Sequence, residues 1–186
     1  MSDEKRPVNP AYEEAKKYKG EGEHRPRFVA FMSSFWKKVG LPNYKTIIGS
    51  SFAWCAVFIV AMNSEVGQKY LASAGARQQR KYGVEVNWKA NGIPRGAVVY
   101  IDHQFNCDGK GSHVGFADGD CAVQDLMKPG ATLPLMGGNQ ANMVKRSVYS
   151  VKEVCAVRWP EEIPLPPPVK VSVDCGGKVG QKESTR

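Results

Sequence analysis

One stretch of the chain constrains its fold more than any other. Residues 49–63 have the sequence GSSFAWCAVFIVAMN, which is small and polar for three residues and almost wholly apolar afterwards. Serines such as Ser50 and Ser51 ahead of an apolar run are typical of a helix start, because a serine side chain accepts a hydrogen bond from a free backbone N–H of the first turn. The run is apolar on every side, so we predict a helix that is buried on all its faces.

A cysteine, Cys55, lies in the first turn or two of this predicted helix. The positive end of the helix dipole stabilises a thiolate, so this placement lowers the pKa of the thiol and favours a nucleophile. The alternative is a core cysteine, because free cysteine is among the most buried residue types. This stretch alone does not separate the two interpretations.

The chain has 186 residues, which is enough for one domain with a substantial core. Its net charge of +8 favours partners with negative charge, such as nucleic acid, anionic lipid or an acidic cell wall. The Lys and Arg residues are scattered rather than gathered in blocks, so nucleic acid is not the favoured partner.

No segment reaches the ~18 to 20 consecutive apolar residues that a membrane span requires. The N-terminal residues MSDEKRP are charged and lack the apolar stretch of a signal peptide. We therefore expect synthesis in the cytoplasm and, if the protein acts outside the cell, export by another route.

The chain has five cysteines and three histidines, and no two cysteines form a C-x-x-C pair. We therefore expect no metal site and no cofactor. The odd count leaves at least one cysteine unpaired. Cys107 and Cys121 are close enough in sequence to close a short loop in an oxidising compartment, although sequence alone does not show the pairing.

The N-terminal half has the patterns of helices. Asn9 and Pro10 predict a helix over residues 10–18, with Asn9 as its cap and Pro10 at the first helical position. Apolar residues at helical spacing predict a second helix over 27–39. Residues 66–82 are predicted as a further helix or, because Gly75 weakens its middle, as two short helical pieces.

The C-terminal half has the patterns of strands. Apolar runs bounded by turn residues predict strands over 97–101, 112–118, 121–124, 144–149 and 154–159. Residues 126–134 are predicted as a loop, and residues 135–140 as a short apolar segment that ends in glycines and polar residues. Helices followed by strands predict an α+β fold with an antiparallel sheet. We expect a flexible arm over 1–9, one domain over 10–160 and a flexible, Pro-rich polar tail over 161–186.

A cysteine nucleophile needs a base within hydrogen-bond reach and a third group that orients the base. Of the three histidines, His24 and His103 are predicted to lie at the surface, whereas His113 opens a strand and is the candidate base. Asn139 and Gln140 are candidates for the third group, because the glycines before them allow close approach of another backbone. The alternative interpretation of His113 is a structural histidine, and that of residues 137–139 is a simple turn.

Several short motifs follow one another along the chain. They are Trp54-Cys55-Ala56, a Pro94-x-Gly96 turn before a strand, His113-Val114-Gly115-Phe116, Gly137-Gly138-Asn139-Gln140 and Arg158-Trp159-Pro160. This ordered set resembles the papain-like cell-wall hydrolases of the NlpC and CHAP superfamily (cysteine, histidine-dependent amidohydrolases/peptidases), and within it a phage-lysin-like branch. The resemblance covers residues 10–160.

The resemblance implies a papain-like fold with Cys55 as nucleophile, His113 as base and Asn139 as the orienting residue. Gln140 is the alternative for the third role. Candidate substrate-binding residues are Trp54, Ser51, Gln140 and Ser112. The branch often has acidic residues just before its Trp-Cys pair, whereas this chain has residues 49–53, GSSFA, so its substrate contacts differ there.

The implied activity is hydrolysis of an amide bond in the peptide part of peptidoglycan, by a monomer that acts in the periplasm or cell wall of a target or host bacterium. Export with a phage lysis system and injection by a type VI secretion apparatus are the two routes, and the second implies a cognate immunity protein. The alternatives in other classes are a wall-binding module without catalysis and a thiol-dependent acyltransferase or protease.

Overall fold

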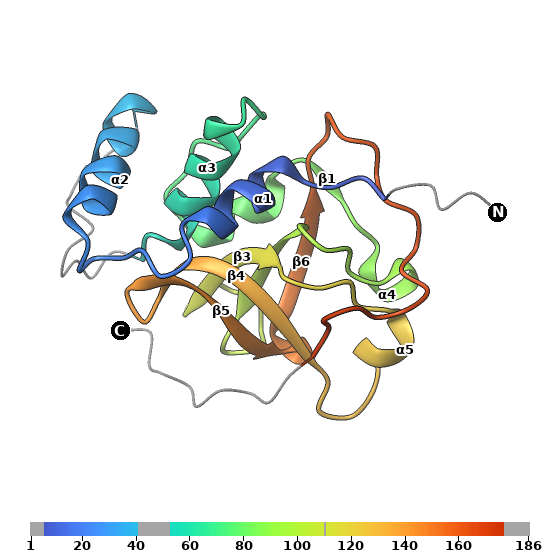
Figure 1. The fold of residues 1–186 in the computed structure, drawn as a ribbon. Coiled ribbons are helices and arrows are strands. Elements are labelled where there is room, and N and C mark those ends of the chain that lie inside the picture. Colours follow the sequence, from blue (N-terminus) through green and yellow to red (C-terminus); the bar gives the residue numbers. More distant parts are fainter. Residues whose placement is uncertain (1–5, 41–52, 110, 177–186) are drawn as a thin grey trace.

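Three helices gather on one side of an antiparallel sheet (Figure 1). The structure is a computed structural model that describes residues 6–40, 53–109 and 111–176. The helices are α1 Pro10–Lys17, α2 Pro26–Lys38 and α3 Cys55–Glu65. Helices followed by strands confirm the predicted α+β class.

The start of α1 follows the sequence prediction. The Asn9 side chain accepts a hydrogen bond from the Ala11 N–H at 3.0 Å, and Pro10 occupies the first turn. Asn9 is fully buried, and its Nδ2 donates to the Gly96 carbonyl at 2.8 Å. The cap therefore also fixes the turn that leads into the sheet, and residue 9 belongs to the domain rather than to a flexible arm.

The helix α3 is buried along the range predicted for it, from Cys55 to Asn63. The predicted serine cap is wrong, because the helix begins at Cys55 with Trp54 as its N-cap residue and without a capping side-chain hydrogen bond. Cys55 is thus the first helical residue, where backbone N–H groups are free of intrahelical partners.

Within the described residues, the sheet has six strands in the order β1-β6-β2-β3-β4-β5, and its strand pairs are antiparallel. The strands are β1 Val84–Glu85, β2 Val98–Asp102, β3 Ser112–Ala117, β4 Thr132–Gln140, β5 Met143–Ser150 and β6 Val154–Trp159. Both faces of the sheet are covered. Val98 and Tyr100 of β2 pack with the helices, whereas Val99 and Ile101 belong to a second core on the opposite face.

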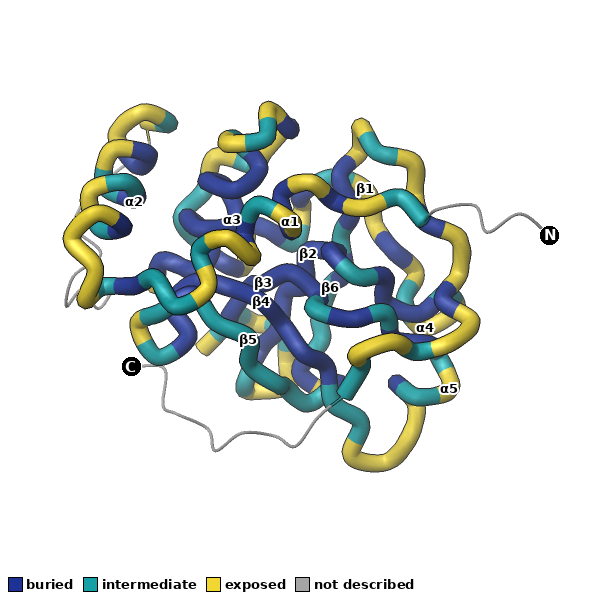
Figure 2. The backbone as a smooth tube through the Cα atoms, in the orientation of Figure 1, coloured by how far each residue is buried: buried dark blue, intermediate teal, exposed yellow. Residues whose placement is uncertain are grey.

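The second core is closed by short elements. The helices α4 Trp88–Asn91 and α5 Val123–Leu126 lie beside it at one end of the molecule (Figure 1). Burial on two faces leaves the central strands enclosed along most of their length, whereas α2 keeps one side exposed (Figure 2). Within the described residues, we find no helix with the length and apolar character needed to cross a membrane.

Residues 66–82 do not form the predicted helix. They contain one 3-10 helix, η1 Ala76–Lys81. Gly75 has an extended backbone, and the Gln79 amide donates to the carbonyls of Leu71 and Ser73. These side-chain bonds satisfy carbonyls that a helix would pair internally, so the segment folds back on itself.

One strand prediction and one loop prediction are also wrong. Residues 121–124 were expected to form a strand, but Cys121 forms only an isolated bridge to Ile93 and α5 begins at Val123. The Ala122 N–H donates to Ser172 Oγ at 2.9 Å, so a side chain from the C-terminal segment replaces a strand partner. The expected loop at 126–134 ends early, because β4 begins at Thr132.

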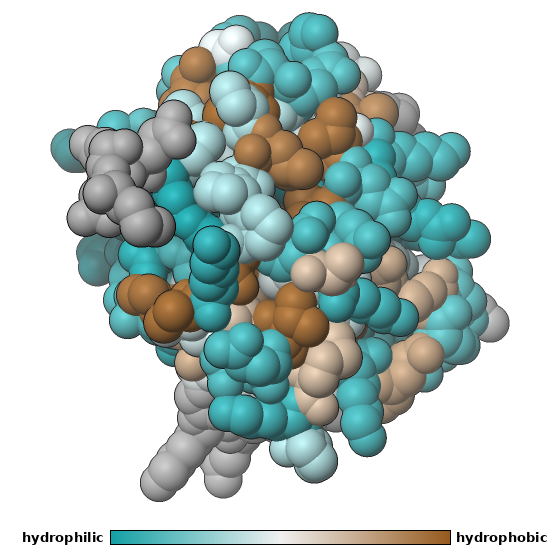
Figure 3. Space-filling model, turned by 90° about the vertical axis from the view of Figure 1, so that its right-hand side faces the viewer, coloured by the Kyte–Doolittle hydropathy of each residue, from teal (hydrophilic) through white to brown (hydrophobic). Residues whose placement is uncertain are grey.

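The C-terminal segment over residues 161–176, predicted as part of a flexible tail, is hydrogen-bonded to the domain. The Val169 N–H donates to the Asn91 carbonyl at 2.7 Å, and the Arg6 guanidinium donates to the carbonyls of Pro167 and Pro168. Residues 177–186 of the predicted tail lie outside the described residues. Figure 3 shows the side of the molecule on which this segment lies. Apolar groups on that side are separated by hydrophilic side chains.

Two disulfides cross-link distant parts of the chain. They join Cys107 to Cys155 and Cys121 to Cys175, and Cys55 is the free cysteine. The loop between Cys107 and Cys121 that the spacing allowed is therefore not closed. Sequence proximity is no guide here, because the bonded cysteines are 48 and 54 residues apart and meet only through the fold.

Candidate active site

The candidate nucleophile Cys55 lies where α3 meets the sheet. Its side chain is fully buried, and its thiol is in hydrogen-bond contact with the backbone of Val114 in β3. Val114 directly follows His113, so the start of α3 and the strand that carries the candidate base meet at this contact. The structure thus brings the Cys55 and His113 segments together.

The pairing between β3 and β4 stops short of this contact. The two strands pair at Phe116–Met136 and Ala117–Leu135, and the register of β4 becomes irregular from Gly137 to Gln140. A Cβ on Gly137 would lie 3.3 Å from Gly115 Cα, so the strands stay close just before they separate.

Trp54 fixes the start of α3 against β4. Its indole ring covers Gly138, where a Cβ would overlap the ring and would lie 2.8 Å from Phe58 Cβ. Its Nε1 donates to Glu23 Oε1 at 3.2 Å. The residue predicted to bind substrate is fully buried and packs the helix onto the glycine motif instead.

The pKa of the Cys55 thiol is opposite to the sequence expectation. Burial raises it to about 11, and hydrogen bonds from the backbone of Val114, Ala56 and Cys55 itself oppose the increase. The cost of desolvating the thiolate therefore outweighs the stabilisation that the positive end of the helix dipole provides. The thiol is protonated at neutral pH and needs a base to become a nucleophile.

His113, the predicted base, is neutral in the folded chain. The side chain is 3% exposed, and its Nε2 is buried without a hydrogen-bond partner in the described part of the chain. Burial lowers the pKa of the imidazole to about 3, with a further contribution from the charge of His103. A neutral imidazole with an unpaired nitrogen is able to accept a proton.

Asn139 does not bond to His113. The paired residues of β3 and β4 are Phe116–Met136 and Ala117–Leu135, and β4 becomes irregular from Gly137 to Gln140, so strand pairing does not bring the two residues together. No hydrogen bond joins the two side chains in the described structure. Asn139 instead adopts a positive φ of 59° within the irregular part of β4.

Gln140 and Ser112 have local structural roles. Gln140 Nε2 donates to the Leu135 carbonyl at 3.4 Å, which holds the irregular end of β4. Ser112 Oγ donates to the Gly109 carbonyl at 3.2 Å and closes the loop between β2 and β3. Ser51, the other predicted substrate-binding residue, lies outside the described residues.

Sequence reasoning missed three residues beside His113. The ring of Tyr149 in β5 stacks with His113 at 5.5 Å between ring centroids and with His103 at 5.9 Å. His103 Nδ1 lies 3.7 Å from the carboxylate of Glu153, which is 2% exposed. His103, predicted as a surface residue, is only 26% exposed. No local pattern marks these residues, because four separate segments supply the group.

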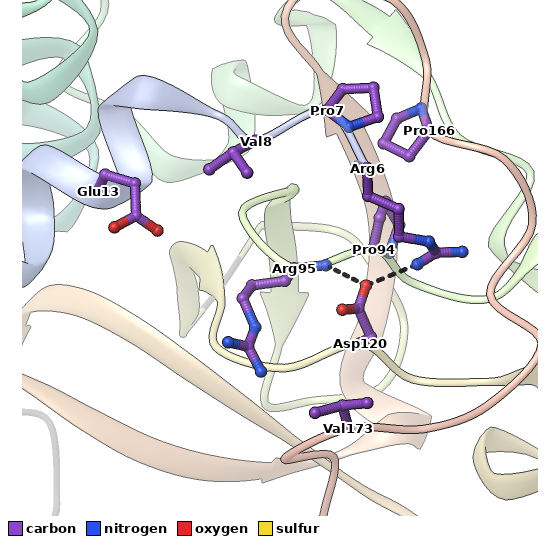
Figure 4. A pocket seen from close by; sticks show the side chains of 9 residues that line it. All are labelled: Arg6, Pro7, Val8, Glu13, Pro94, Arg95, Asp120, Pro166 and Val173. Atoms are coloured by element: carbon purple, nitrogen blue, oxygen red, sulfur yellow. Dashed lines mark hydrogen bonds and ion pairs between the residues drawn. The ribbon is translucent and has the colours of Figure 1, made fainter. Parts of the chain in front are cut away.

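A pocket lies elsewhere, between the N-terminal residues and the C-terminal segment (Figure 4). Asp120 accepts hydrogen bonds there from the Arg6 guanidinium at 2.9 Å and from the Arg95 backbone N–H at 3.1 Å. None of its lining residues belongs to the predicted site. Over the described ranges, no group of three or more His, Cys, Asp or Glu side chains is arranged to hold a metal ion.

Comparison of the chain with protein-family models, with curated proteins and with solved structures gives no match. The resemblance to cell-wall hydrolases therefore rests on the ordered motifs, and the chemistry of the site rests on its geometry.

Proposed function

We propose that the chain is a papain-like cysteine hydrolase that cleaves an amide bond in the peptide part of peptidoglycan. The observation that carries the proposal is the contact between the free thiol of Cys55, at the first position of a buried helix, and the backbone of the residue that follows His113. Thiol hydrolysis requires a base within hydrogen-bond reach of the nucleophile, and rigid, adjacent elements that carry the two residues favour such an approach.

The reaction begins with both groups neutral, since the pKa of the thiol is about 11 and that of the imidazole about 3. His113 accepts the Sγ proton as Cys55 attacks the substrate carbonyl, and the two new charges then stabilise each other. The backbone N–H of Cys55 is at a helix start and donates to the developing oxyanion.

The imidazolium of His113 next gives its proton to the leaving amine, and the acyl group remains on Cys55 as a thioester. His113, neutral again, removes a proton from water, and the water oxygen attacks the thioester carbon. Sγ leaves and recovers the proton from His113, which restores the starting state.

Two features support a substrate outside the cytoplasm. Disulfides form and persist in oxidising compartments such as the periplasm, and the structure has two of them. The net charge of +8 suits an anionic wall. Delivery by a phage lysis system or by a type VI secretion apparatus is compatible with both features, and an injected toxin requires an immunity protein in the producing cell.

Digestion of purified sacculi tests the proposal. The oxidised protein is incubated with sacculi, and the soluble muropeptides are identified by mass spectrometry. We expect new peptide ends or free stem peptides, which also identify the bond. Cys55→Ala and His113→Ala should abolish their release, whereas His24→Ala, at an exposed histidine, should not.

Each other result counts against the proposal. Binding of sacculi without new ends indicates a wall-binding module. Product formation by Cys55→Ala excludes the thiol mechanism. Transfer of the stem peptide to an added amine in place of water indicates an acyltransferase.

A further inference from the structure

The base of a thiol hydrolase must be held in one orientation, and the predicted Asn139 does not hold His113 by a hydrogen bond. The Nε2 atom of His113 is also without a partner in the described structure. Packing and stacking are therefore left to fix the imidazole plane.

Tyr149 supplies the stacking surface. Its ring and that of His113 are inclined by 27°, with centroids 5.5 Å apart. Tyr149 is anchored in β5, where it pairs with Leu133 of β4. An aromatic ring on a paired strand has little freedom to move, so it restricts rotation of the imidazole that packs on it.

His103 extends the same stack. Ile101 pairs with His113, and the His103 N–H bonds to the Gly111 carbonyl, so both imidazoles lie on one face of the β2–β3 hairpin. Tyr149 packs on His103 with the same inclination of 27°. The hairpin register thus presents two imidazoles to one tyrosine.

Glu153 secures the outer end of the stack. It lies in the 3-10 helix η2 Val151–Glu153, just before β6, and its buried carboxylate is 3.7 Å from His103 Nδ1. The Cys107–Cys155 disulfide joins the loop after His103 to the strand after Glu153, with the two Cα atoms 5.7 Å apart. The covalent bond therefore keeps His103 and Glu153 together.

We propose that Tyr149, His103 and Glu153 form a positioning set that holds the His113 imidazole for proton transfer with Cys55. Tyr149 contacts the base, His103 supports Tyr149 from the hairpin, and Glu153 orients His103. This inference rests on the proposed thiol chemistry, because it gives the set a role only if His113 acts as the base.

The groups that face His113 determine how it titrates. They are His103 after β2 and Tyr149 on β5, with Glu153 beyond His103. A charge on His103 lowers the pKa of His113, so loss of His103 should raise it. Burial is the larger cause of the low pKa of His113, so a substitution that leaves His113 buried isolates the contribution of His103.

Variants at Tyr149 distinguish the contribution of its ring from that of its hydroxyl group. Tyr149→Phe keeps the ring and should keep the activity. Tyr149→Leu should lower kcat on a purified muropeptide by roughly 10-fold to 100-fold with KM changed less than about threefold, because the base is misplaced and substrate contacts remain. Tyr70→Leu, at a tyrosine that is 39% exposed, is the matched control and should behave as the native chain does.

Nitrogen-15 NMR of the imidazoles gives a second measurement that does not depend on hydrolysis. The chain has three histidines, so His24→Gln and His103→Gln suffice to assign them. We expect His113 in a single tautomer in the native chain, tautomer averaging in Tyr149→Leu, and titration of His113 at higher pH in His103→Gln.

The two proposals fail in different ways. If the native chain releases no muropeptides but His113 responds to Tyr149→Leu and His103→Gln as expected, the proposed function is wrong and the packing relationship stands. If hydrolysis occurs and folded Tyr149→Leu matches the native chain in kcat and in the His113 spectrum, the positioning set is wrong. Should Tyr149→Leu not fold, an unchanged His113 titration and kcat in His103→Gln would overturn it equally.

Discussion

Gly138 lies directly under the indole ring of Trp54, so that the start of α3 and the glycine motif of β4 are in van der Waals contact. This relationship places Cys55, the residue after Trp54, beside the point where β3 and β4 separate. The position of the thiol is thus decided by a residue that has no side chain.

Gly138→Ala should displace the start of α3. The added methyl group would overlap the Trp54 ring and approach Phe58 Cβ to 2.8 Å. Overpacking of this kind costs about 1–3 kcal/mol of unfolding free energy, and we expect hydrolysis to fall by at least about 10-fold. Urea unfolding and muropeptide release measure the two effects.

Gly130→Asn is the control for that substitution. Gly130 has φ of 74° with open space around the added atom, and asparagine tolerates this backbone conformation. Native-like activity of Gly138→Ala would show that the helix start can move without loss of the site.

Protonation of His113 should lower stability in acid. The pKa of its imidazole is about 3 in the folded chain against 6.5 for an unperturbed histidine. Between these values the unfolded chain binds more protons, so the free energy of unfolding falls as the pH decreases, by up to about 1.4 kcal/mol per pH unit. Urea titrations from about pH 7 to about pH 5 measure the slope.

His113→Gln removes this contribution, and its unfolding free energy should depend less steeply on pH over the same range. The exposed His24 provides the comparison, because His24→Gln should keep the native slope. Equal slopes for the native chain and His113→Gln would mean that His113 is not buried in its neutral form.

The two disulfides should differ in their effect on hydrolysis. Cys107–Cys155 holds the loop that carries His103, whereas Cys121–Cys175 attaches the C-terminal segment. Replacement of both cysteines of either disulfide by serine should lower the free energy of unfolding by about 2–4 kcal/mol. We expect a further loss of kcat in Cys107→Ser/Cys155→Ser, and native kcat in the folded fraction of Cys121→Ser/Cys175→Ser.

Thermal unfolding and muropeptide kinetics below the melting temperature distinguish these effects. Each double variant serves as the control for the other, since both lose one cross-link of similar span. An equal loss of kcat in both would indicate a general loss of stability rather than a role of the His103 loop.

Substitution of Asn139 tests whether its side chain or its backbone matters. Its φ of 59° is strained for alanine and free of strain for glycine. We therefore expect Asn139→Ala to have a free energy of unfolding about 1 kcal/mol below that of the native chain, and Asn139→Gly to match the native chain. Hydrolysis should be retained in Asn139→Gly. Loss of hydrolysis in a stable Asn139→Gly would instead assign the orienting role to the asparagine amide.

Much of the local structure follows from neighbouring residues. The Asn9-Pro10 start of α1 and the burial of α3 were predicted from cap chemistry and from an apolar run without a polar face. The failures occur where distant residues intervene. Gln79 bonds to Leu71 and Ser73 and stops a helix that its composition favours.

The sequence by itself determined that a buried helix carries Cys55 near its start, that His113 lies on a strand, and that the fold is α+β. The tertiary structure decided the cysteine pairing, the packing of the C-terminal segment and the Tyr149–His103–Glu153 group. It also reversed the expected pKa of Cys55, because a helix start is a local feature whereas desolvation depends on everything packed around the thiol. Patterns along a chain record local preferences, and the chemistry of a buried side chain is set by segments that only folding brings together.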